Sequence, residues 1–397
     1  MSVKSILSYS SIFLALSVFA FTLVFHSMTD RDVRSVIRLP KKTVSEQVAL
    51  TAGRCSDREK ITDLESASDP HLLKLSEYQA VCDSFVTDRI MLFTDMPKDK
   101  NGAVESAKKM AETLKEFSRF HVTPIVVVEP VNEWGLIDFK EFGTGFYDKW
   151  ITAYFKAIKA EGVTDDMMGI WVPFPEANLP YWNHENATPK DFSVIVNKYL
   201  GTLKKEFPQA KGSVLLNSAT YDNEDFNWES GEYVSLVPYV SGIKKGLVDS
   251  FGIQGFPWAP PAGSERVGLF DAREYLNARL AMEAADTLEV KDIWFNTGSF
   301  SSKYTLDEKM TIAVDPGKRK DVLNGILSEV ISAQKKGYSV WLNIFAENKS
   351  QLAEATDWSY WSDTDQASDL NRSVFVDFMV KAKDIDIPVS LFDVRHQ

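Results

Sequence analysis

The hydrophobic and polar positions of this chain follow one alternating pattern from about residue 89 to residue 345. Seven short apolar runs are typical of strands that are buried on both faces. They span residues 89–94, 123–128, 169–174, 213–217, 250–255, 292–295 and 339–344. Between them lie stretches with the apolar periodicity of amphipathic helices. These stretches span residues 103–120, 146–161, 191–207, 272–287 and 319–337.

Buried strands that alternate with helices predict a parallel sheet. A closed barrel of eight strands fits the repeat better than an open doubly wound sheet, and an eighth strand is expected near residues 80–100. No glycine-rich phosphate loop follows any of the strands, so a dinucleotide-binding fold has no support. We therefore expect an α/β fold, a (β/α)8 TIM barrel, over residues 81–397.

The first part of the chain has a different character. Residues 6–25 are almost wholly apolar, and a helix of about 20 residues spans a hydrocarbon core of roughly 30 Å. We interpret residues 1–27 as an uncleaved transmembrane signal anchor and residues 28–80 as a polar stalk, which would place the barrel outside the cytoplasm. The positive-inside tendency opposes this orientation through five basic residues after the apolar run. They are Arg31, Arg34, Arg38, Lys41 and Lys42.

Charge and composition exclude several classes of partner. The formal net charge is −12 and the pI is near 5.1, and no basic block with interleaved aromatics occurs, so nucleic-acid binding is not expected. The five histidines are scattered without ligand spacing, and we expect neither a metal nor a cofactor. Cys55 and Cys82 are compatible with one disulfide or with two unpaired thiols.

In a parallel barrel the residues that follow the C-terminal ends of the strands share one face and form the site. Reading those ends gives a set of polar and aromatic residues. They are Asp95, Glu129, Glu176, Asn217, Asp222, Gln254, Trp258, Asn296 and Glu347. Glu176 follows an apolar run and precedes large aromatics, an arrangement typical of a general acid in sugar cleavage. Trp134, Trp182, Trp258 and Trp358 are candidates for stacking on sugar rings, whereas Trp171, Trp294 and Trp341 lie inside strands and are expected in the core or on the floor of the cleft.

Four motifs resemble glycoside hydrolase family 26 in order and spacing, the retaining barrel enzymes best known as endo-β-mannanases. The motifs are VVVEP (126–130), PEANLPYW (175–182), VDSFGIQGFPW (248–258) and IWFNTGS (293–299). The segment WLNIFAENK, with Asp357 and Trp358, is similar to the last strand and loop of that family. The resemblance covers about residues 85–365.

The resemblance implies roles for individual residues. Glu176 falls on the acid/base, Asn178 on the asparagine of the same motif, and Tyr181 or Trp182 on its aromatic. Four positions depart from the family pattern at the chemistry. Pro175 replaces a histidine, Val172 an arginine, Phe256 a tyrosine and Asn296 the glutamate nucleophile. An amide cannot attack the anomeric carbon, so the retaining mechanism lacks one of its two carboxyls.

Three explanations of Asn296 stay open. The site holds sugar without cleaving it, or the amide orients a substrate 2-acetamido group that attacks its own anomeric carbon, or a base has moved to another position. Candidates for that base are Asp95, Glu129, Asp222 and Glu347. The expected substrate contacts are Asp95, Glu129, Trp134, Asn178, Tyr181, Trp182, Asp222, Gln254, Phe256, Trp258, Glu347 and Trp358.

The sequence thus predicts a membrane-anchored, glycoside-hydrolase-like barrel that binds a β-linked polysaccharide. The first hypothesis is a pseudoenzyme or a partner of polysaccharide-assembly proteins. The alternative is an active hydrolase of β-glycans with Glu176 as general acid and an unusual base or substrate-assisted attack. A third reading is a structural membrane subunit that binds no sugar.

Overall fold

The computed structural model describes the barrel region of the chain. The described residues are 89–96, 100–119, 123–132, 135–179, 188–218, 235–257, 271–298, 303–306, 310–313, 316–345 and parts of 374–392. The predicted anchor and stalk, with Cys55 and Cys82, lie outside them. Within this part of the chain no helix has the length and apolar character needed to cross a membrane. Anchoring and location outside the cytoplasm stay predictions.

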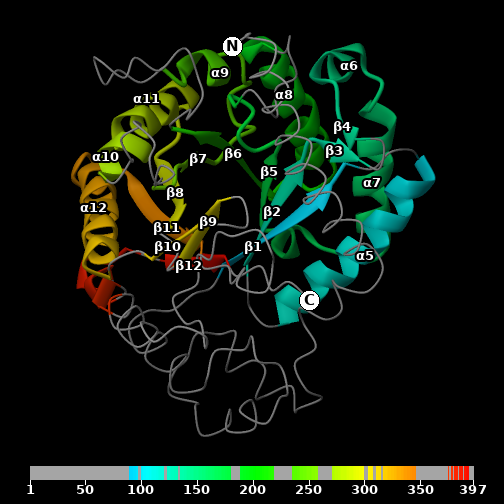
Figure 1. Ribbon diagram of the computed structural model, residues 1–397. Coiled ribbons are helices and arrows are strands. Elements are labelled where there is room, and N and C mark those ends of the chain that lie inside the picture. Colours follow the sequence, from blue (N-terminus) through cyan, green and yellow to red (C-terminus); the bar gives the residue numbers. More distant parts are fainter. Residues whose placement is uncertain are drawn as a thin grey trace, which may run out of the picture.

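Eight parallel strands form a closed barrel in the order β1-β12-β11-β8-β7-β6-β5-β2 (Figure 1). They are β1 (Arg89–Asp95), β2 (Thr123–Glu129), β5 (Ile170–Pro173), β6 (Lys211–Asn217), β7 (Ser250–Gln254), β8 (Asp292–Gly298), β11 (Ser339–Phe345) and β12 (Val389–Phe392). The seven predicted strands are confirmed. The expected position of the eighth was wrong, because the ring closes through β12, where Leu391 pairs with Ile90 of β1.

The long helices lie around the outside of the ring (Figure 1). They are α5 (Lys100–Arg119), α7 (Asp148–Ala160), α8 (Pro189–Glu206), α11 (Ala278–Leu288) and α12 (Pro316–Lys335). The helix predicted over 272–287 is in fact two, α10 (Ala272–Tyr275) and α11. The break occurs because the side chain of Asn277 caps α11 by accepting a hydrogen bond from the backbone N–H of Arg279.

The remaining elements are short. They are α6 (Phe139–Thr144), the 3-10 turn at Asp165–Met167, α9 (Val237–Val240), and two hairpins, β3 (Val131–Asn132) with β4 (Gly135–Leu136) and β9 (Lys303–Leu306) with β10 (Met310–Ala313). The hairpins follow β2 and β8 respectively, so both insertions come directly after the C-terminal end of a barrel strand.

Side chains of the strands alternate between the barrel interior and the layer beneath the helices. The interior cluster is Met91, Ile125, Val127, Ile170, Val172, Leu215, Trp294 and Trp341. The Trp294 and Trp341 rings stack with centroids 4.9 Å apart, and Trp294 Nε1 donates to Ser213 Oγ at 2.9 Å. Trp171 is also buried, on the helix side of β5. The three tryptophans expected in the core are therefore there, and the interior is filled rather than open.

The close packing of Trp294 depends on a glycine in β7. A Cβ atom built on Gly252 lies 2.4 Å from Cε2 of Trp294. We expect Gly252→Ala to lower the free energy of unfolding by about 1–3 kcal/mol, because the indole has to shift within a packed interior. A Cβ atom built on Gly201 in α8 has nothing within 4 Å. Gly201→Ala is therefore the control and should raise the free energy of unfolding by about 0.5–1 kcal/mol. Urea denaturation measures both, and equal effects would contradict the packing argument.

Candidate functional site

Polar side chains form a row at the C-terminal end of the barrel. Asp95 of β1 pairs in register with Glu129 of β2. Asn217 of β6 pairs with Gln254 of β7, and Gln254 pairs with Asn296 of β8. Each of these side chains lies on the inward-facing side of its strand. Asn217, for example, lies two residues after the interior Leu215, and Asn296 lies two residues after the interior Trp294. The sequence-predicted residues Asp95, Glu129, Asn217, Gln254 and Asn296 therefore share one end of the barrel.

Asn343 of β11 belongs to the same row, and sequence reasoning missed it. It pairs in register with Asn296 and is fully buried. Asn343 lies in the middle of the apolar run WLNIF, so the reading of strand ends did not select it. The signal that identifies it is its position two residues after the inward-facing Trp341, since alternate residues of a strand face the same side.

Glu176 reaches the row from the turn that follows β5. Its backbone N–H donates to the carbonyl of Leu215 at 2.8 Å. Two residues later, Asn178 Nδ2 donates to the carbonyl of Asn217 at 2.7 Å, and Asn178 Oδ1 accepts from the N–H of Asn217 at 2.9 Å. The side-chain amide thus pairs with β6 as a strand residue would, and it fixes the turn to the barrel. A direct contact between Asn178 and substrate stays a prediction.

The turn has an unusual backbone. Phe174 and Glu176 have φ angles of 49° and 53°, in the left-handed region that side chains with a Cβ rarely adopt. Packing compensates for the strain, since the ring of Phe174 lies 5.4 Å from that of Phe139 and 5.2 Å from that of Phe142. Strained backbone held by its surroundings is common at functional sites. It aims the Glu176 carboxyl at the row of polar side chains.

The Glu176 carboxyl is bound by two amides. Its Oε1 accepts from Asn217 Nδ2 at 2.8 Å and from Gln254 Nε2 at 2.5 Å. Gln254 Oε1 in turn accepts from Asn296 Nδ2, and Asn296 Oδ1 accepts from Asn343 Nδ2 at 2.6 Å. Glu176 and Asn296, the two residues at the centre of the sequence prediction, are therefore separated by one side chain.

The carboxyls of Glu129, Asp95 and Glu176 interact electrostatically at this end of the barrel. Glu129 is 3% exposed. Burial raises its pKa from 4.5 to about 8, and the negative charges of Asp95 and Glu176 add to the rise. Glu129 therefore holds a proton at neutral pH. Among the described residues, no group of histidine, cysteine, aspartate and glutamate side chains is arranged to hold a metal ion.

Several predicted contacts fall in the loops that follow the strands. Seven of them lie outside the described residues, and their roles stay predictions. They are Trp134, Tyr181, Trp182, Asp222, Trp258, Glu347 and Trp358. Phe256, two residues beyond β7, is described and half-buried.

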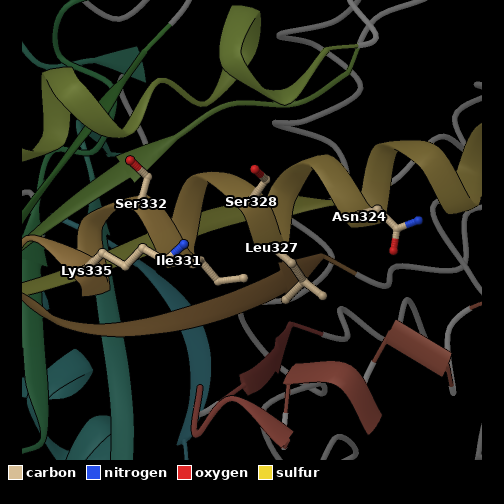
Figure 2. Close-up of a pocket in the computed structure, with 6 residues that line it drawn as sticks. All are labelled: Asn324, Leu327, Ser328, Ile331, Ser332 and Lys335. Carbon is tan, nitrogen blue, oxygen red and sulfur yellow. The ribbon is translucent and has the colours of Figure 1, made fainter.

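A surface hollow lies elsewhere, along one face of α12 (Figure 2). Its lining side chains all come from that helix. They are Asn324, Leu327, Ser328, Ile331, Ser332 and Lys335. None of them is a predicted site residue, and the hollow contains no carboxyl. The predicted site residues of β1, β2, β6, β7 and β8 that the structure describes lie at the C-terminal end of the barrel instead.

No protein-family model and no curated protein sequence matches the chain. Solved structures with a similar chain path include β-glycosidase BGL167, at 12% identity and TM-score 0.49, over 77% of this chain and 85% of that one. A β-glucosidase from Thermotoga maritima in complex with castanospermine matches at 10% identity and TM-score 0.46, over 81% and 92%. The GH26 β-mannanase BoMan26A from Bacteroides ovatus matches at 11% identity and TM-score 0.46, over 86% and 94%. These likenesses carry no conclusion about the fold or the activity of this chain, and the barrel rests on its own strand pairing.

Proposed function

We propose that the C-terminal end of this barrel binds a β-linked glycan and does not cleave it by retaining double displacement. One observation carries the proposal. Asn296 occupies the end of β8, where the family 26 resemblance expects the nucleophile, and its amide is bonded on both sides, to Gln254 and to Asn343. A retaining hydrolase needs two carboxyls about 5–5.5 Å apart at this point, and an amide locked between two other amides cannot form the glycosyl intermediate.

The chemistry of the row suits a neutral sugar. Carboxyls accept hydrogen bonds from hydroxyls, while side-chain amides both donate and accept, so together they match hydroxyl groups of either polarity. Glu129, Glu176 and Asp95 supply the carboxyl side of the row, and burial excludes water from much of it. Aromatics predicted in the following loops, such as Trp182 and Trp258, would supply the stacking faces. Anchoring by residues 1–27 would place this site at a membrane surface, beside proteins that assemble polysaccharide.

The test is binding without turnover. The full chain is titrated calorimetrically with the hexasaccharides of β-1,4-mannan, β-1,4-glucan, β-1,4-xylan and β-1,3-glucan, and reducing ends are assayed in parallel. We expect saturable binding to at least one, with no release of reducing ends. Glu176→Ala should weaken that binding about tenfold or more, because a hydrogen bond to a charged group contributes about 1.5–3 kcal/mol.

The matched control is Glu283→Ala on the exposed side of α11, where an outward carboxylate forms only a loose ion pair with Arg279. It should bind the same sugar as the unaltered chain does. Absence of binding to all four hexasaccharides, or equal weakening by both variants, would overturn the proposal in favour of a structural barrel.

Hydrolysis is the second candidate, and Glu129 favours it. A carboxyl with a pKa of about 8 is a proton donor at neutral pH, and Asp95 and Glu176 stand close enough to raise that pKa further. An inverting reaction would need a donor and a base about 6.5–9.5 Å apart. Release of reducing ends by the unaltered chain, lost in Glu129→Gln and in Glu176→Gln, would establish this function and remove the binding-only proposal.

A further inference from the structure

Gln254, Asn296 and Asn343 form a hydrogen-bonded chain with one direction, which we name the amide row. Each amide donates toward Glu176, and Gln254 and Asn296 each also accept from the next strand. The direction follows from the carboxyl end. Oε1 of Glu176 accepts, so Gln254 turns its Nε2 toward it and its Oε1 toward β8. Asn296 must then donate to Gln254, and Asn343 must donate to Asn296.

Because the amides are buried, the orientation of each one depends on the orientation of its neighbours. Asn296 is 3% exposed and Asn343 is 0% exposed. A single reversed amide would set two oxygens, or two N–H groups, face to face without water, at a cost of about 1–3 kcal/mol for each unsatisfied group. Because each amide fixes the next, the row keeps its order or reverses as a whole.

We infer that the amide row couples position 343 to Glu176, so that a group at position 343 that accepts instead of donating turns the other end of Gln254 toward the Glu176 carboxyl. In the observed direction the Gln254 nitrogen binds Oε1, while Asn217 Nδ2 binds the same oxygen from β6. Two donors from different strands fix the plane of the carboxyl. The inference rests on the proposed function only in taking Glu176 as the group that meets the sugar. Asn296 of β8 then has a structural role in the amide row, in addition to standing where the family resemblance expects a nucleophile.

Asn343 offers a test far from the carboxyl, since two amides separate it from Glu176. Asn343→Leu removes the donor to Asn296 and supplies no acceptor in its place. Asn343→Asp removes the same donor but adds an acceptor, so Asn296 should turn its Nδ2 toward β11, and Gln254 should then turn its Oε1 toward Glu176. The readout is the side-chain amide resonance of Gln254 in the full chain, labelled with 15N at asparagine and glutamine side chains. Glu176→Gln, which keeps a neutral acceptor, gives the reference position.

We expect the Gln254 amide protons to stay at their original position in Asn343→Leu, because their acceptor is unchanged. In Asn343→Asp at pH 9 they should move upfield, to the Glu176→Gln position or beyond. They should return toward the original position as the pH falls, because burial favours the protonated form of the new carboxyl, which can then donate. Asp95 and Glu129, which lie on β1 and β2 near Glu176, are unchanged in both variants, so the leucine variant subtracts their contribution.

An unchanged Gln254 resonance in Asn343→Asp at pH 9, or equal movement in both variants, would show that the amides do not act as one row and would overturn the inference. The measurement contains no sugar. The Gln254 resonance can move as expected in a chain that binds no glycan, and it can stay unchanged in a chain that binds glycan. The two proposals can therefore fail independently.

Discussion

Glu129→Gln is expected to remove most of the loss of stability that the barrel suffers between about pH 4.5 and pH 8. The folded state raises the pKa of Glu129 from 4.5 to about 8. Folded protein therefore keeps a proton in this range that unfolded protein releases. The stability from this group is complete below pH 4.5, and it is lost as the pH rises through 8. By linkage the full effect is about 5 kcal/mol, which is of the order of the whole stability of many domains.

Urea unfolding of both proteins at intervals from pH 4 to pH 9 measures this effect. Glutamine keeps the shape of the protonated carboxyl, so the variant should match the unaltered chain near pH 4.5 and be several kcal/mol more stable near pH 9. Glu283→Gln, on the exposed face of α11, is the control and should follow the unaltered chain throughout. Parallel pH curves for the unaltered chain and Glu129→Gln would show that the Glu129 carboxyl is not buried in its protonated form.

Most of the barrel follows from the hydrophobic pattern because its strands are buried on both faces. Runs such as TPIVVV in β2 have no other place in a soluble fold, and seven of the eight strands carry this signal. β12 does not. Its four residues, VSLF, are too few for a period to be measured, and only its pairing with β11 and β1 identifies it. The break at Asn277 was missed for a related reason, since one capping side chain interrupts an otherwise continuous helical period.

The clustering of these polar residues at one end of the barrel was predictable from the sequence, and the hydrogen bonds between them were not. Strand ends share one face in any parallel barrel, so Asp95, Glu129, Gln254 and Asn296 were placed together from sequence alone. Which amide bonds to which carboxyl depends on the stagger between strands, and this sets Asn217, Gln254, Asn296 and Asn343 at one level. The raised pKa of Glu129 depends on burial, which no local pattern reveals.

Asn178→Ala is expected to destabilise the fold by about 3 kcal/mol, because two buried groups lose their partners at once. The Asn178 amide bonds both the N–H and the carbonyl of Asn217, at 2.9 Å and 2.7 Å. Alanine removes both of these hydrogen bonds from buried groups and supplies nothing in their place. The same substitution releases the turn that keeps Glu176 at a φ of 53°, so Glu176 should also lose its fixed position against Asn217 and Gln254.

The chain contains a matched control for this change. Asn197 of α8 makes the same double contact, with Nδ2 donating to the Gly242 carbonyl at 2.8 Å and Oδ1 accepting from the Lys244 N–H at 2.7 Å, but at the surface. Water replaces both contacts there, so Asn197→Ala should cost about 1 kcal/mol or less. Urea unfolding at one pH compares the two variants. A loss in Asn178→Ala no larger than that in Asn197→Ala would mean that water reaches the end of β6, and the Glu176 turn would then be held by its backbone hydrogen bond to Leu215 and by the packing of Phe174.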